Sequence, residues 1–155
     1  MSTPHRQLHL GAFLFGVGHH IAAWRHPNVD PAAALRPQHY KNLARIAEAG
    51  LFDAIFSANT LHIMGWTEVE ALFAALPAVL TDDARLTVYG PFNYGGRFTS
   101  ESNAAFDASL KADDPKRGIR DFEAVDALAR SIGFTLAEDL PMPANNRCLS
   151  WCRGA

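Results

Sequence analysis

Two polar side chains that could do chemistry, Asn59 and His62, follow directly after the apolar stretch FDAIFSA. A stretch of that length predicts a strand of a parallel sheet, and ligands of open α/β sheets bind beyond the carboxyl ends of such strands. An imidazole at that edge can take a proton from a substrate, and a carboxamide can orient the substrate. We therefore expect His62 to be a candidate base and Asn59 its catalytic partner. Capping of the following turn is the structural alternative for both residues.

A second ligand-facing edge is expected where the next apolar stretch ends in Tyr89-Gly90-Pro91-Phe92. Because parallel strands end at one edge of a sheet, Tyr89 and Phe92 become candidate substrate-binding residues. The NYGGR segment that follows looks mobile, which supports a second edge that faces the ligand. Gly95 and Gly96 also suit an ordinary turn.

Other motifs give weaker signals. Gly16-Val17-Gly18 follows an apolar stretch but lacks the third glycine, the helix and the acidic residue of a dinucleotide-binding loop. The histidines at positions 19, 20 and 26 lack the spacing and the carboxylates of a metal site, so no metal is expected. Ser57 has no nucleophile elbow around it.

Composition limits the classes of function. The chain has 155 residues and a formal net charge of −2, which gives no electrostatic case for binding nucleic acid or an acidic membrane. The apolar run at residues 10–18 is too short to span a bilayer. Cys148 and Cys152 are four apart in an expected strand, about 13 Å from one another and beyond disulfide reach. We expect a reduced, cytoplasmic protein.

The elements that must position these residues alternate between strand and helix. Gly50 is placed to end one helix, and Thr67 with Glu70 has the pattern of a capping box at the start of another. This order predicts an α/β sheet with a parallel core and an antiparallel hairpin, closed by the PMPANN turn, at its carboxyl-terminal edge. The expected strands are 8–15, 52–58, 85–92, 134–140 and 147–151, and the expected helices are 38–49, 67–80, 99–112 and 121–132.

Three ordered motifs from residue 52 onward resemble domain-of-unknown-function family 938, a group of class I S-adenosylmethionine-dependent methyltransferase-like proteins. They are FDAIFSANTLHIMGW, LTVYGPFNYGGRFTSESNAAFDASLKADDPKRGIRD and MPANNRCLSW. The resemblance implies the second half of a Rossmann-like, three-layer sheet, mostly parallel, with S-adenosylmethionine as cofactor. It also adds Asn103 and Asn145 to the substrate-binding candidates, beside Tyr89 and Phe92.

Residues 6–56, which include LHLGAFLFGVGHHIAAWRHPNVDP, instead resemble the amino-terminus of luciferase-like, flavin-dependent monooxygenases of the nitrilotriacetate monooxygenase type. We therefore expect a chimera that forms one compact unit. Residues 1–51 would supply a foreign strand and helix, and residues 52–155 the methyltransferase-like half.

The resemblances imply three alternative functions. The favoured one is a methyltransferase-like protein that is weakly active or inactive, because the glycine-rich loop and the acidic residue that hold the cofactor are missing. A fragment of a flavin-dependent monooxygenase would use reduced flavin mononucleotide, with Phe13, His19 and Trp24 near it. The third is a non-catalytic remnant or a subunit of a homo-oligomer. The expected partner is a small methyl acceptor, with no nucleic acid and no membrane.

Overall fold

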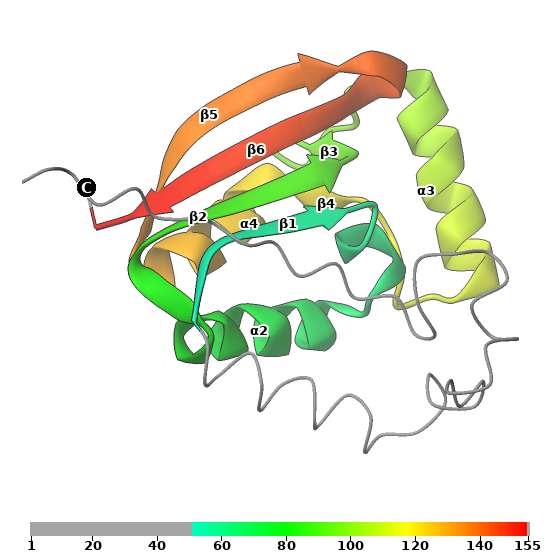
Figure 1. Ribbon diagram of the computed structural model, residues 1–155. Helices are drawn as coiled ribbons and strands as arrows, with labels where there is room; N and C mark the ends of the chain where they lie inside the picture. The colour runs from blue at the N-terminus through cyan, green and yellow to red at the C-terminus, as the bar shows by residue number, and fades with distance from the viewer. Residues whose placement is uncertain (1–50, 155) are drawn as a thin grey trace, which may run out of the picture.

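A four-stranded mixed sheet forms the centre of the computed structural model, which describes residues 51–154 (Figure 1). The order across the sheet is β1 (Phe52–Ala58), β2 (Leu80–Gly90), β6 (Asn146–Arg153) and β5 (Phe134–Met142). β1 and β2 are parallel, whereas β6 is antiparallel to both β2 and β5. The expected α/β class and the terminal hairpin are confirmed. Within the described strands, however, β6 lies inside the sheet and only one of these three pairs is parallel.

Helices pack on one face of the sheet and at one of its ends. α2 (Trp66–Ala75) and α4 (Phe122–Ser131) cover the same face, and α3 (Glu101–Asp113) stands at the end where β1 and β2 finish (Figure 1). The short 3-10 turns are η3 (Leu61–Ile63), η4 (Leu76–Ala78) and η5 (Pro143–Asn145). A two-stranded sheet pairs β3 (Phe92–Asn93) with β4 (Arg120–Asp121) in parallel.

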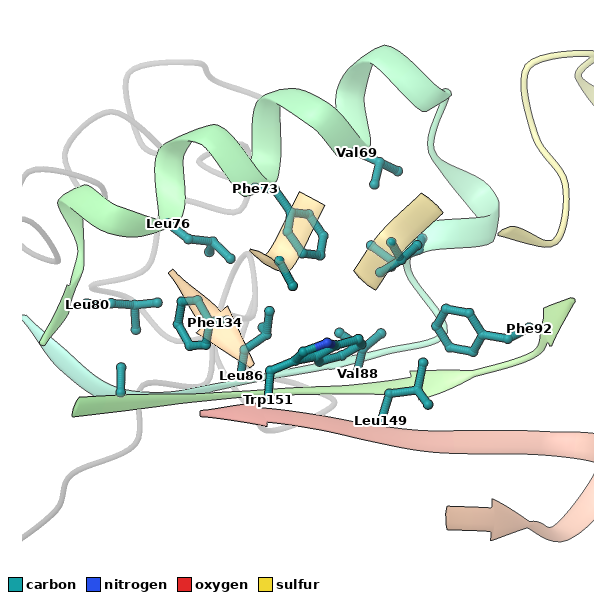
Figure 2. Close-up of a cluster of buried hydrophobic side chains, with 14 residues drawn as sticks. Val69, Phe73, Leu76, Leu80, Leu86, Val88, Phe92, Phe134, Leu149 and Trp151 are labelled. Atoms are coloured by element: carbon teal, nitrogen blue, oxygen red, sulfur yellow. The ribbon is translucent and has the colours of Figure 1, made fainter. Parts of the chain in front are cut away.

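The core fills the space between the sheet and α2 with α4. Val69 and Phe73 of α2 point toward Trp151 of β6, and Leu86 lies opposite Trp151 across the β2–β6 ladder (Figure 2). Because side chains alternate along a strand, Leu86 and Val88 of β2 reach this core from one strand and Leu149 and Trp151 of β6 from the other. Trp151 is fully buried, and its indole Nε1 donates a hydrogen bond to Asp126 Oδ1 of α4 at 2.9 Å. This contact connects the inner strand to the covering helix.

Several expected boundaries were wrong, including the end of helix 67–80, because α2 stops at Ala75 and Leu80 already lies in β2. α2 starts after Gly65 rather than Thr67, and the carboxylate of Glu68 accepts the Gly65 backbone N–H. Glu68 lies three residues after Gly65, as Glu70 lies after Thr67, so the sequence offers the same acidic spacing twice. β2 begins at Leu80 instead of residue 85, because the backbone N–H of Phe52 bonds to Val79 O at 2.7 Å and draws the chain into the sheet earlier.

The terminal hairpin matches its prediction closely. Cys148 and Cys152 both lie in β6 and are free thiols, as expected. Among the described helices, none is long and apolar enough to cross a membrane. The expected strand 8–15, loop 16–37 and helix 38–49 lie outside the described residues. Phe13, His19, Trp24, the other histidines of that loop and the Gly16–Gly18 motif lie outside them too.

The loop between α3 and β4 is fixed by a buried carboxylate. Asp107 of α3 accepts the Ile119 backbone N–H at 2.8 Å and pairs with Lys111 Nζ at 2.6 Å. Gly118, next to Ile119, has φ +150, and its own backbone N–H donates to His62 O at 3.0 Å. Asp107 thus holds this loop against the turn that carries His62.

We expect Gly118→Ala to lower the free energy of unfolding by at least about 2 kcal/mol, because backbone strain and overpacking add up. A Cβ at this position would lie 2.8 Å from Asp107 Oδ1 and 2.9 Å from Lys111 Cε. Gly95→Ala is the matched control: Gly95 has φ +56 and open space around its Cβ position, so only about 1 kcal/mol should be lost. Urea denaturation followed by circular dichroism measures both. Equal losses in the two variants would contradict the tight fit at Gly118.

Candidate functional site

A cavity of about 460 Å³ opens at the carboxyl ends of β1 and β2, between α3 and the turn that joins β5 to β6. In Figure 1 the β5–β6 turn lies beside one end of α3, next to the ends of these strands. Segments far apart in the sequence therefore meet at one edge of the sheet. The cavity is lined by Asn59, His62, Pro91, Ser102, Asn103, Phe106, Ala144, Asn145 and Asn146.

The end of β1 is shaped by Asn59. This residue has φ +53, a left-handed conformation that asparagine tolerates better than most residues, and its backbone N–H donates to Tyr89 O at 2.8 Å. The chain leaves the sheet there and enters η3, which carries His62. A Cβ on Gly90 would lie 3.7 Å from Asn59 Oδ1 and 3.8 Å from His62 Nδ1. The two predicted catalytic side chains therefore meet above the end of β2.

Arg120 of β4 fixes the turn that carries His62. Its Nε donates to Leu61 O at 3.0 Å, and one of its terminal nitrogens donates to the carbonyls of Met64 and Lys116. The guanidinium carbon also lies 6.0 Å from the centre of the Trp66 ring. Arg120 thus binds carbonyls on both sides of His62 and holds η3 in place.

The imidazole of His62 is kept neutral by its surroundings. The residue is 6% exposed, and its ring stands edge-on to that of Phe106 at a centroid distance of 5.4 Å. Burial in the first place, and the positive charge of Arg120 in the second, lower the pKa of His62 below its ordinary value of 6.5. A neutral imidazole has a free lone pair, which is the form that a general base requires.

We expect Arg120→Gln to raise the pKa of His62, as measured by NMR titration of the imidazole protons. In the wild type, the folded state resists protonation of His62 more than the unfolded state does. Stability is therefore full above pH 6.5 and is lost as the pH falls from there toward the lower folded pKa. This acid loss should shrink in Arg120→Gln. Arg130→Gln is the control, because Arg130 is exposed on α4 and pairs with Asp126. A His62 pKa that is unchanged in Arg120→Gln would contradict this account.

Two predicted substrate-binding residues, Asn103 and Asn145, lie together on the outer wall of the cavity. Asn103 Nδ2 donates to Asn145 O at 3.1 Å, and Asn145 Nδ2 donates to Ser102 Oγ at 3.0 Å. The Ser100 hydroxyl caps α3 by accepting the Asn103 backbone N–H. Helix α3 and the β5–β6 turn are joined by these bonds, which form the outer wall of the cavity.

Tyr89 and Phe92 lie elsewhere. The Tyr89 hydroxyl accepts a hydrogen bond from Asn146 Nδ2 at 3.1 Å, so it supports the cavity wall from behind. Phe92 is 1% exposed and belongs to the hydrophobic core, whereas its neighbour Pro91 lines the cavity. The structure does not bring Phe92 to the cavity, which leaves a substrate-binding role for it as a sequence prediction only.

The NYGGR segment forms a turn closed by backbone hydrogen bonds, and none of its residues lines the cavity. Tyr94 and Arg97 pair through two backbone hydrogen bonds of 3.1 and 3.0 Å, with Gly95 and Gly96 between them at positive φ. The Tyr94 hydroxyl donates to Asp139 Oδ2 at 2.8 Å. Burial, together with this bond to a carboxylate, raises the pKa of Tyr94 to about 12. The turn reading of the two glycines is confirmed.

The candidates from the sequence omitted Arg120 and five of the lining residues, which are Pro91, Ser102, Phe106, Ala144 and Asn146. Ser102 and Phe106 could have been found from Asn103, because they neighbour it along the chain or one helical turn away. Asn146 carries the same turn signal as Asn145. Arg120 gave no signal, since its role depends on carbonyls about 60 positions earlier in the chain. In residues 51–154, no three His, Cys, Asp or Glu side chains gather as a metal site would require.

Comparison with protein families gives one match over most of the chain. The family model described as "Protein of unknown function (DUF938)" matches residues 16–153. The matched residues include the four-stranded sheet, the helices α2, α3 and α4, and every residue that lines the cavity. It also reaches upstream of Phe52, into residues for which the sequence suggested a different resemblance.

Known structures share the fold at low identity. The O-methyltransferase family protein from Burkholderia thailandensis is 15% identical, with a TM-score of 0.61 over 72% of this chain and 33% of that protein. The mitomycin 7-O-methyltransferase is 16% identical, with a TM-score of 0.58 over 77% of this chain and 40% of that one. The Rossmann-like fold of methyltransferases is therefore shown, and at these identities the likeness concerns the fold alone.

A curated sequence relative belongs to another class of enzyme. The N-acetyl-S-(2-succino)cysteine monooxygenase of Bacillus subtilis is 34% identical over 113 residues. The match takes in 64% of this chain and 26% of the monooxygenase. The chain thus spans about a quarter of that relative and less than half of the two methyltransferases.

Proposed function

The chain belongs to the DUF938 family, and from this premise we propose that it is a methyltransferase-like protein whose cavity receives the methyl acceptor. One observation carries the proposal: a buried, neutral imidazole and several carboxamides converge beyond the carboxyl ends of two parallel strands. The O-methyltransferase fold of the neighbouring structures supports it. S-adenosylmethionine is the proposed methyl donor.

His62 has the role of general base in this proposal, and Asn59 orients the acceptor. The lone pair of the neutral imidazole would take the proton from an acceptor O–H or N–H as the methyl group is transferred. Asn59 Oδ1 lies on the same side of Gly90 as His62 Nδ1, where it can accept a second hydrogen bond from the same substrate. Asn103 and Asn145 would bind the far side of the acceptor.

We expect methyl transfer by this chain to be weak or absent. Methyl transfer depends on in-line positioning of donor and acceptor more than on acid–base chemistry. The sequence contains neither the three-glycine loop nor the acidic partner with which related folds hold a cofactor. We therefore propose that the binding site for the cofactor is incomplete. The described residues form the binding site for the methyl acceptor.

A methyl-transfer assay with isotope-labelled S-adenosylmethionine tests this proposal, with resorcinol as the acceptor. We expect transfer far below an ordinary enzyme turnover of about 1 s⁻¹ or more. Any transfer above background should fall about 10²–10⁴-fold in His62→Gln, which removes the base. Turnover at ordinary enzyme rates, or transfer that His62→Gln leaves unchanged, would contradict the assignment.

A second candidate function is favoured by the 34% identity to a monooxygenase. In this alternative the residues before Phe52 come from a luciferase-like, flavin-dependent monooxygenase, and the chain is a splice of two genes. Reduced flavin mononucleotide would then be the cofactor. Purified protein that retains a yellow flavin chromophore would support this alternative, and colourless protein that takes up no added flavin would count against it.

A further inference from the structure

The carboxamides of the cavity present hydrogen-bond acceptors to a ligand. Asn103 Nδ2 donates to Asn145 O and to Thr99 Oγ1 at 2.9 Å. Asn146 Nδ2 donates to Pro143 O at 3.2 Å and to the Tyr89 hydroxyl. Because a backbone carbonyl can only accept, these bonds fix which amide atom is nitrogen at both residues. Their nitrogens are engaged within the protein, and the atoms left for a ligand are their Oδ1 oxygens.

Asn59 and His62 add acceptors on the opposite wall. Asn59 Oδ1 and His62 Nδ1 lie on the same side of Gly90, and no described residue makes a hydrogen bond to either side chain. His62 is more than nine-tenths buried and lines the cavity. A neutral imidazole offers one acceptor nitrogen and one N–H donor, and the Asn59 carboxamide likewise offers one acceptor oxygen beside its amide nitrogen. The cavity therefore has acceptors on both of its walls.

The remaining lining defines the charge and the shape of the ligand. None of the nine lining residues is an Asp, Glu, Lys or Arg, so an anion bound there would find no ion-pair partner in the lining. Phe106 meets the His62 ring at 70° and gives one wall an apolar aromatic surface. Such a surface suits a flat apolar ring with polar groups at its edge.

We propose that this cavity is selective for an uncharged ring compound that donates hydrogen bonds through hydroxyl or amino groups, and that it rejects carboxylates and phosphates. This ligand class rests on the proposed function in one respect, since the same O–H or N–H group would be the methyl acceptor. The selectivity itself depends on the acceptor atoms of the cavity that are left for a ligand, and it does not require S-adenosylmethionine.

Binding to the whole chain, measured by ligand-observed NMR without S-adenosylmethionine, tests the proposal with three matched probes. Resorcinol has two hydroxyl donors, 1,3-dimethoxybenzene keeps both oxygens but only as acceptors, and 3-hydroxybenzoate has a carboxylate in place of one hydroxyl. We expect resorcinol to bind about tenfold or more tightly than either of the others, because 1,3-dimethoxybenzene cannot donate either hydrogen bond and 3-hydroxybenzoate loses one donor and carries a charge that the lining does not pair.

Asn59→Gly removes one acceptor without straining the backbone, because glycine adopts φ +53 freely. This variant should bind resorcinol about two- to tenfold more weakly and leave the binding of 1,3-dimethoxybenzene unchanged. Ala144→Gly is the matched control, since Ala144 also lines the cavity at positive φ (+58) but contributes no side-chain acceptor.

Three results would overturn the proposal: equal affinities for the three probes, tighter binding of 3-hydroxybenzoate, or no binding of resorcinol up to its solubility limit. An Asn59→Gly variant that is indistinguishable from Ala144→Gly would also count against it. Selective binding of resorcinol together with turnover at ordinary enzyme rates, or with methyl transfer that His62→Gln leaves unchanged, would leave the ligand class standing while the proposed function fails. Weak methyl transfer that depends on His62, without this selectivity in binding, would leave the proposed function standing while the ligand class fails.

Discussion

Replacing Trp151 with alanine should lower the free energy of unfolding by about 3–5 kcal/mol, which is a large part of the stability of a domain this size. The side chain is 0% exposed and lies between β6 and the helices that cover the sheet (Figure 2). Its removal would leave a cavity where Phe73 and Leu86 now pack. It would also remove the donor to Asp126 Oδ1.

Trp151→Phe separates the two contributions. Phenylalanine keeps most of the apolar contact but cannot donate to Asp126, whose other oxygen still binds Arg130 Nε at 2.7 Å. We expect this variant to lose about 1–3 kcal/mol, the usual cost of leaving a buried acceptor without its partner. Urea denaturation followed by circular dichroism measures both variants. If alanine costs no more than phenylalanine, Trp151 is not the centre of the core.

Replacing Asp107 with alanine should cost about 2–3 kcal/mol and should also disturb the cavity. The buried Ile119 N–H would lose its acceptor, and the loop before β4 would lose its anchor on α3. Gly118, in the same loop, donates to His62 O, and Arg120 binds the carbonyl of Leu61. Displacement of this loop should therefore weaken resorcinol binding as well as stability.

Lys111→Ala is the control for Asp107. It removes the partly exposed cation that pairs with Asp107 but leaves the bond to Ile119 intact. Solvent screens the exposed Lys111 end of this pair, and Asp107 keeps its bond to the Ile119 N–H, so this variant should lose only about 1 kcal/mol and bind resorcinol like the wild type. A loss as large as that of Asp107→Ala would mean that the ion pair, not the loop anchor, stabilises this region.

Local patterns in the sequence predicted elements better than their ends. The strand 52–58 was predicted with its observed limits, because Gly50 and Asn59 bound its apolar residues in the sequence. The start of α2 was missed because Gly65 caps that helix without a side chain, and its signal lies in Glu68. Asp82 and Asp83 fall between the expected helix 67–80 and the expected strand 85–92, yet they lie within β2.

The candidate site was partly predictable for a topological reason. Asn59 and His62 follow a strand that is parallel to β2, and polar residues beyond such strand ends meet at one edge of a sheet. Asn103 and Asn145 reached the cavity through helix α3 and the β5–β6 turn. Phe92 could not be placed correctly from sequence, because the direction of its side chain depends on how the chain leaves β2 at Gly90 and Pro91.

Titration calorimetry of S-adenosylmethionine into the whole chain tests the central claim most directly. The claim is that this chain holds the acceptor side of a methyltransferase-like site without a competent cofactor side. We predict no binding in the micromolar range, because the sequence has no complete glycine-rich loop to hold the cofactor. Micromolar binding of S-adenosylmethionine would contradict the account and would mean that the chain builds a cofactor site of its own.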